Sequence, residues 1–159
     1  MEEEVTESPK QRHDRELIEL LNELRVALPG VQVLFAFLLA VPFTARFGKV
    51  DHFEKIAFFV ALVATTMSSA LLIATPSFHR LRFRVEDKDK IVTLGNRLSI
   101  AGFFALAVAM IAATLTVASF LYGKVVGIAT AASLAVFIFA LWYGLALQAY
   151  VRERARRSR

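Results

Sequence analysis

Four long stretches of the sequence contain no Asp, Glu, Lys or Arg, and they constrain the fold more than any other feature. They comprise 20, 23, 26 and 27 residues and cover 26–45, 56–78, 98–123 and 125–151. About 20 apolar residues, at a helical rise of roughly 1.5 Å each, cross the hydrocarbon core of a bilayer. The apolar fraction of 57% also exceeds the roughly 45–50% of soluble domains. We therefore predict an all-α membrane protein with four transmembrane helices, spanning about residues 29–46, 56–78, 98–122 and 125–151.

Lys and Arg are unequally divided between the two sides of such a protein. Of the 19 basic residues, 15 lie in the N-terminal segment, the second connection and the C-terminal tail, and four lie in the first and third connections. Cytoplasmic segments of membrane proteins carry the excess of Lys and Arg. We therefore expect a multi-pass protein of the plasma (inner) membrane of a bacterium, with cytoplasmic termini and a basic tail over residues 152–159.

The segment before the first span carries an amphipathic pattern. Residues 1–8 are expected to form a flexible acidic N-terminus. Over residues 9–28 the leucines recur at helical spacing, at positions 17, 20, 21, 24 and 28, which predicts an N-terminal amphipathic helix, cytoplasmic or interfacial, on the lipid headgroups or against a partner. Pro29 removes a backbone donor and clashes with the carbonyl of Arg25. We therefore expect Pro29-Gly30 to bend the chain between this helix and the transmembrane domain over residues 29–151. The alternative is a single kinked helix that continues straight into the cytosol.

Arginine alternates with apolar residues in the second connection, which begins FHRLRFR. Arg80, Arg82 and Arg84 are expected to contact anionic lipid headgroups while the apolar residues enter the bilayer. So short a basic stretch beside a membrane does not suit nucleic-acid binding.

Further polar residues gather at the level where the spans meet the cytoplasm. This candidate cytoplasmic polar cluster consists of Glu23, Arg25, Gln32, His79, Arg80, Asn96 and Arg97. Two interpretations stay open, namely ordinary anchors at the membrane surface or a vestibule that responds to protons or anions.

Small residues recur at every fourth position of the last two spans, which lets helix backbones approach closely in lipid. The candidate helix-packing residues are Ala105, Ala109 and Ala113 in the third span and Gly127, Ala131 and Ala135 in the fourth. They predict a tightly packed bundle that forms a homo-oligomer or binds another membrane protein.

Several classes of function are disfavoured by the composition. The chain has no cysteine, its three histidines are scattered, and no nucleophile–base pair is evident, so we expect no enzyme activity, metal or cofactor. The predicted spans also lack the interior ionisable residues that ion-coupled transporters generally use. We favour a non-catalytic structural or accessory subunit. The alternative is a small oligomeric transporter or channel for cations or protons, in which Glu23 and His79 would titrate.

Three stretches, ELRVALPGVQVLFAFLLAVPF, FHRLRFR and NRLSIAG, resemble an uncharacterised actinobacterial family of small four-span integral membrane proteins, a domain of unknown function. The resemblance runs from about Glu23 to Trp142 and implies the same topology. Some members of that family carry an automatic sodium–proton antiporter label, which implies cation exchange.

Overall fold

A computed structural model describes the backbone of residues 9–81 and 88–157, with the side chains of Arg15, Ile18, Glu19 and residues 22–74 and 93–142. The chain forms four long helices over these residues: α1 (Pro9–Ala40), α2 (His52–Leu81), α3 (Lys88–Tyr122) and α4 (Lys124–Arg157). Two short 3-10 turns, η1 (Val41–Phe43) and η2 (Phe47–Lys49), separate α1 from α2. No strand occurs in the described part of the chain, so the predicted all-α fold is confirmed.

Each of these four described helices is long and apolar enough to cross a membrane. Their apolar stretches contain 22, 23, 30 and 19 residues and cover Asn22–Phe43, His52–Ala74, Thr93–Tyr122 and Lys124–Trp142. At a rise of 1.5 Å per residue, the shortest stretch extends for about 28 Å, close to the thickness of the hydrocarbon core. The helices are therefore compatible with a multi-pass membrane protein, as the uncharged stretches predicted.

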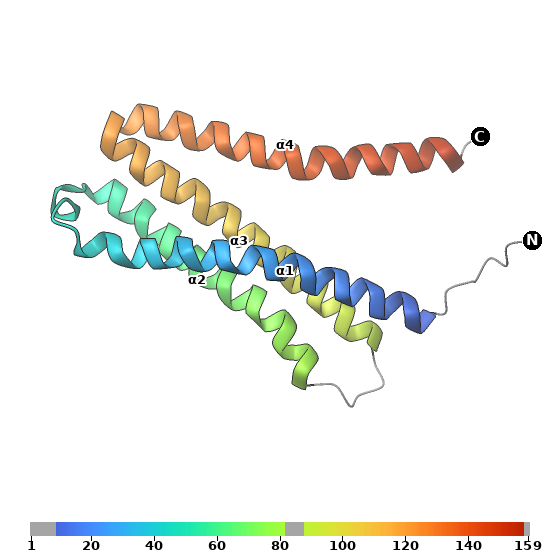
Figure 1. Cartoon of the computed structure of the whole chain (residues 1–159). Helices are drawn as coiled ribbons and strands as arrows, with labels where there is room; N and C mark the ends of the chain where they lie inside the picture. The colour runs from blue at the N-terminus through green and yellow to red at the C-terminus, as the bar shows by residue number, and fades with distance from the viewer. Residues whose placement is uncertain (1–8, 82–87, 158–159) are drawn as a thin grey trace, which may run out of the picture. The chain divides into compact units, whose positions relative to one another are not determined.

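Helix α1 runs without interruption through Pro29. The prediction of a bend at Pro29-Gly30 was wrong. The amphipathic segment and the first span belong to one helix of 32 residues. Figure 1 shows this helix as a rod without a sharp bend. Leu24 and Val31, on opposite sides of the proline, are 1% and 0% exposed and belong to the same apolar core. Packing on both sides holds the helix in line, so α1 tolerates the missing backbone hydrogen bond.

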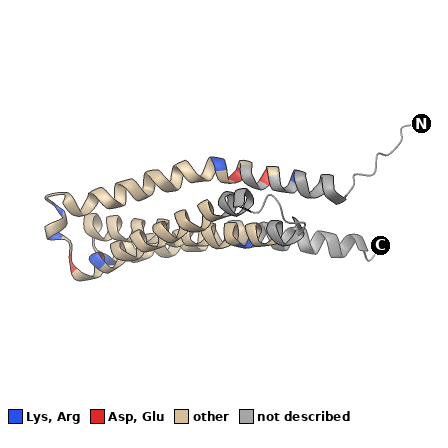
Figure 2. Cartoon of the chain, turned by 90° about the horizontal axis from the view of Figure 1, so that it is seen from below, with Lys and Arg blue, Asp and Glu red and all other residues tan. Residues whose placement is uncertain are grey.

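Charge along α1 changes abruptly near its middle. In Figure 2 the acidic and basic residues colour its N-terminal part, and a long stretch without either colour follows up to the end of the helix. Arg25 is the last charged residue before this stretch. The polar and apolar parts that the sequence distinguishes are thus two portions of one continuous helix.

The chain divides into two compact units, each of which has its own packing. Unit 1 comprises Met1–Thr44 with Leu62–Leu106, and unit 2 comprises Ala45–Ala61 with Ala107–Arg159. The apolar core of unit 1 joins three helices through Leu24, Leu28 and Val31 of α1, Leu72 of α2, and Phe103 and Leu106 of α3.

Within unit 1, α2 and α3 approach closely at Gly102. A Cβ atom on this glycine would lie 2.6 Å from Cδ2 and 2.8 Å from Cγ of Leu72. Such distances are too short for carbon atoms in van der Waals contact. The missing side chain therefore lets Leu72 lie directly on the α3 backbone.

Within unit 2, the single residue Gly123 connects α3 to α4. Its φ of +88° falls in the region that favours glycine. Its amide donates to the Ser119 carbonyl over 2.9 Å, and its carbonyl accepts from the Gly127 amide over 3.0 Å. Gly123 thus contributes to the last turn of α3 and to the first turn of α4.

The two helices then make close contact at Gly127. A Cβ atom there would lie 2.8 Å from N and 2.9 Å from Cα of Ser119, and it would overlap the Ser119 hydroxyl. Because these neighbours include backbone atoms, a side-chain rotation cannot make room. The α3–α4 seam therefore depends on the glycine.

Candidate functional site

A cluster of charged and aromatic side chains lies in unit 2 where α2 and α4 begin. This loop-end cluster consists of Asp51, Phe53, Glu54 and Lys124. Asp51 Oδ1 accepts the Glu54 amide over 2.8 Å, and Glu54 Oε2 accepts the Asp51 amide over 3.0 Å. This reciprocal pair is a capping box, with Asp in the position that Ser or Thr usually holds. It satisfies amides that the first turn of α2 would otherwise leave unpaired.

Lys124, the first residue of α4, connects the cluster to a second helix. Its Nζ lies 2.7 Å from Asp51 Oδ2 and 5.6 Å from the centroid of the Phe53 ring. A cation at a helix N-terminus is unfavourable because the helix dipole is positive there. The Asp51 carboxylate and the Phe53 ring offset this effect. The Asp51 carboxylate therefore contacts the first turn of α2 through the Glu54 amide and the first turn of α4 through Lys124.

The electrostatics of Asp51 follow from these contacts. The hydrogen bond from Lys124, followed by the bond from the Glu54 amide, lowers the Asp51 pKa below its usual 3.8. The Asp51 carboxylate is therefore ionised at neutral pH. The Lys124 and Asp51 side chains are 56% and 42% exposed, so solvent weakens their attraction.

Glu54 differs from Asp51 because its side chain is buried. Only 7% of this residue is exposed, although it lies in the first turn of an apolar helix. Its carboxylate adds a second formal negative charge beside one ammonium group. The described residues contain no group of three His, Cys, Asp or Glu side chains suited to a metal.

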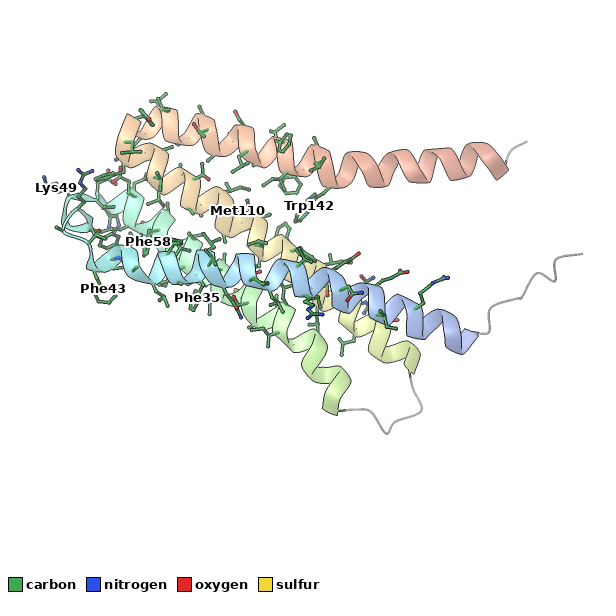
Figure 3. The ribbon with its side chains drawn as sticks, viewed as in Figure 1. Phe35, Phe43, Lys49, Phe58, Met110 and Trp142 are labelled. Atoms are coloured by element: carbon green, nitrogen blue, oxygen red, sulfur yellow. The ribbon has the colours of Figure 1, made fainter. Side chains whose placement is uncertain are left out.

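The connecting segment is also attached to α2 by an aromatic contact. The Phe47 and Phe58 rings meet edge to face, with centroids 5.2 Å apart and planes inclined by 68°. Figure 3 shows Phe58 on α2 next to the segment that carries Lys49. Residues 45–51 are therefore fixed both at Phe47 and at Asp51.

The predicted cytoplasmic polar cluster belongs to unit 1. Its described side chains do not bond to one another. Glu23, Arg25 and Gln32 on α1, and Asn96 and Arg97 on α3, are all exposed. Between the described side chains of these five residues there is no hydrogen bond or ion pair. Their role as surface anchors or as a vestibule stays a prediction.

The remaining predicted polar residues fall outside the described side chains. His79 and Arg80 lie in the last turn of α2, where only the backbone is described, and Arg82 and Arg84 belong to a segment outside the described residues. Their contact with lipid headgroups therefore stays a prediction as well.

The candidate helix-packing residues are mostly enclosed by the chain itself. Ala105, Ala109, Gly127 and Ala131 are buried, and Ala113 and Ala135 are partly exposed. Gly127 lies against Ser119 of the same chain, so this part of the pattern contributes to the internal seam.

Hydroxyl side chains recur within the apolar stretches. Four of them donate to a carbonyl of the preceding turn over 2.8–2.9 Å: Thr66 to Leu62, Thr116 to Ala112, Thr130 to Val126, and Ser133 to Ala129. Three buried hydroxyls have no partner among the described atoms, those of Ser68, Ser69 and Ser119.

Residues 6–146, which make up most of the chain, match the model of a protein family. The chain belongs to DUF6328, a family of unknown function. No curated protein and no solved structure matches this chain. The match to DUF6328 extends beyond both ends of the resemblance predicted for residues 23–142, and it includes the loop-end cluster.

Sequence reasoning missed this cluster of the DUF6328 protein. The available signal is the acidic pair Asp51 and Glu54, spaced for a capping box just before an apolar stretch. Lys124 is a second signal, because it is the one charged residue between two long uncharged stretches. Neither signal predicts that Asp51 and Lys124 meet, because that contact depends on how distant helices pack.

Proposed function

We propose that this protein is a non-catalytic integral membrane protein, a structural or accessory subunit that packs tightly and associates with itself or with another membrane protein. The contact between Gly127 and the Ser119 backbone is the observation that carries this proposal. Apolar side chains gain little by leaving lipid for a helix interface, so close backbone packing drives helix association in membranes. A chain built on such contacts is suited to packing against other helices.

Four hydroxyl side chains of the apolar stretches support the same role. Thr66, Thr116, Thr130 and Ser133 direct their hydroxyl hydrogens to carbonyls of their own helices. A hydroxyl bonded in this way satisfies itself locally and has no donor left for a substrate.

The two helices with the smallest buried share, α1 and α4, offer the surfaces for association. Buried residues make up 11% of the apolar stretch in both α1 and α4, against 39% in α2 and 33% in α3. Large apolar side chains such as Phe37 and Val136 are 68% and 69% exposed. Gly127 and Ala131 are already buried, so a second copy would use a different face of α4.

A transport assay tests this proposal. The protein is reconstituted into lipid vesicles, and proton and sodium fluxes are measured under imposed gradients of either ion. We expect fluxes equal to those of protein-free vesicles. A protein-dependent flux that disappears in Glu54→Gln would contradict the accessory role.

The alternative function is a small oligomeric transporter or channel for cations or protons, as the antiporter label of similar proteins implies. One observation favours it: Glu54 places a buried carboxylate within an apolar helix. Ionisable groups are costly in membranes and often mark ion pathways. Glu23→Gln and His79→Ala test the two groups that the sequence suggested, and Glu54→Gln tests the third.

We also infer that the protein lies in the plasma membrane of a bacterium, with both termini in the cytoplasm. We expect this bacterium to be an actinobacterium. The division of Lys and Arg into 15 and four supports this orientation. Arg80, Arg82 and Arg84 would then face the anionic leaflet. Reporter fusions should place residue 159 in the cytoplasm, and an external C-terminus would overturn the orientation.

A further inference from the structure

We propose that the connection between α1 and α2 binds the phosphate of an anionic phospholipid through Arg46 and Lys49, with Lys55 of α2 as a third basic contact. Headgroup contact was predicted from the sequence only for the second connection, so this site is a separate one. Such a site goes beyond a packing role, because it names a lipid ligand, and it does not depend on self-association.

The position of the connection along the chain suits a lipid headgroup. The apolar stretch of α1 ends at Phe43, and that of α2 begins at His52. Both stretches are long enough to cross the hydrocarbon core, so residues 44–51 between them lie at the level of the headgroups. Basic side chains at this level are attracted to the phosphates of anionic lipids.

Arg46 and Lys49 are held on one side of a tight turn. The Lys49 amide donates to the Arg46 carbonyl over 3.0 Å, and the turn between them is the 3-10 helix η2. Side chains three residues apart eclipse one another in such a helix. Both side chains are exposed, and an added Cβ on Gly48 would meet nothing within 4 Å. Figure 3 shows Lys49 at the outer end of the connection. Residues 46–49, the basic turn, are therefore open to a phosphate, which a guanidinium and an ammonium group both bind.

The acidic residues of unit 2 near the basic turn do not neutralise it. Asp51 accepts from Lys124 at Oδ2 and from the Glu54 amide at Oδ1. Glu54 is only 7% exposed and accepts the Asp51 amide. Among the described residues, the basic side chains of the turn and of Lys55 form no hydrogen bond or ion pair. An anionic group from outside the chain can therefore bind these three cations.

Apolar side chains on α2 favour a lipid as the source of that anionic group. The edge-to-face contact of Phe47 with Phe58 keeps the basic turn beside the first two turns of α2. Lys55 and Phe59 lie four residues apart there, on one face of the helix. Lys55 is exposed, and Ile56 and Phe59 are 52% and 63% exposed. A phospholipid matches both kinds of group, because its acyl chains follow directly after its phosphate.

Quenching of tryptophan fluorescence by brominated lipids measures which lipid occupies this site. The chain has one tryptophan, so Trp142→Phe combined with Phe59→Trp places the reporter on the same face as Lys55. The full chain is reconstituted into phosphatidylcholine vesicles in which a fraction of either phosphatidylglycerol or phosphatidylcholine is brominated. We expect the site to favour phosphatidylglycerol about five-fold or more, the effect of one basic residue near an anionic lipid.

Substitutions then test whether the basic turn causes this preference. Arg46→Gln combined with Lys49→Gln should abolish it, and Lys55→Gln should reduce it. Arg25→Gln combined with Arg97→Gln is the matched control, because it also removes two exposed basic residues and should leave the preference unchanged.

The native tryptophan supplies a second control within the same fold. Trp142 is 43% exposed and lies about 27 Å along α4 from Lys124. In protein that keeps Phe59 and Trp142, the substitutions at Arg46 and Lys49 should leave the lipid preference at Trp142 unchanged. A local lipid site affects one reporter, whereas a general effect of charge affects both.

Three results would overturn the proposal. The first is equal quenching by both lipids in the folded protein. The second is a preference that survives without the basic turn, or that falls equally at Trp142 or in the matched control. The third is loss of the preference on addition of inorganic phosphate but not of sodium chloride at equal ionic strength, which would identify a site for soluble phosphate. Helical circular dichroism checks the fold of each variant, and Lys55→Gln decides if the double substitution does not fold.

Discussion

Replacing Gly127 by alanine tests whether the α3–α4 seam depends on direct backbone contact. The new methyl carbon would lie 2.8 Å from N and 2.9 Å from Cα of Ser119, besides overlapping the hydroxyl. Carbon atoms in van der Waals contact are roughly 3.5–4.0 Å apart. The helices must therefore separate by several tenths of an ångström or more, which weakens contacts along the whole seam.

Two opposing effects set the magnitude. Alanine is favoured over glycine in a helix by about 1 kcal/mol. Overpacking of a close contact costs about 1–3 kcal/mol, and rigid backbone neighbours place this site at the upper end. We expect a net loss of about 2 kcal/mol in the free energy of unfolding. For a chain of this size, that loss lowers Tm by about 4–8 °C.

Thermal unfolding in detergent, followed by helical circular dichroism, measures the change. Two other glycines supply matched controls: at Gly30 an added Cβ meets nothing within 4 Å, and at Gly102 it meets the movable side chain of Leu72 most closely. We expect Gly30→Ala to equal or exceed the parent in Tm, Gly102→Ala to fall slightly below it, and Gly127→Ala to fall furthest. A Gly127→Ala protein as stable as Gly30→Ala would refute the reasoning.

Three further substitutions follow from the same structure. Pro29→Ala should raise the unfolding free energy by about 1–3 kcal/mol, because alanine restores a donor inside α1 and removes a clash; a lower Tm would contradict this. Gly123→Ala should cost about 1 kcal/mol, since φ is +88° there, and an unchanged Tm would contradict the strain. The lowered Asp51 pKa means that the ion pair stabilises the fold above pH 3.8 and that this contribution disappears as the pH falls through the lowered pKa. The Tm values of the parent and Lys124→Gln should therefore differ at pH 7 and converge well below pH 3.8.

The all-α fold with four long apolar helices could be predicted because it depends on local composition. As helices, the uncharged stretches are long enough to cross the hydrocarbon core of a bilayer. They can be recognised from the sequence without knowledge of tertiary contacts. Pro29 shows where this reasoning fails. Its intrinsic preference is to break a helix, but packing of Leu24 and Val31 on either side overrides that preference.

The roles of the candidate site residues stay predictions, and their contacts could not be predicted from the sequence for a related reason. Residues 23–32 and 96–97 lie near the predicted ends of the membrane spans. Residues at the same depth in a membrane need not contact one another, however, because they can lie on different faces of their helices. The small-residue pattern on α4 indicated a packing face, yet the pattern contains nothing that distinguishes Ser119 of the same chain from a second copy. Asp51 and Glu54 carried a readable capping signal, whereas their link to Lys124 is a tertiary contact between distant segments.

The central claim, a packing and self-associating membrane protein, is tested most directly by counting subunits in lipid. Protein labelled at one introduced cysteine, Tyr122→Cys, is reconstituted into vesicles at increasing dilution, and photobleaching steps are counted for single spots. We predict two or more bleaching steps per spot, and this number should persist at dilutions at which two chains rarely enter one vesicle by chance. Single steps throughout, from folded protein, would contradict self-association.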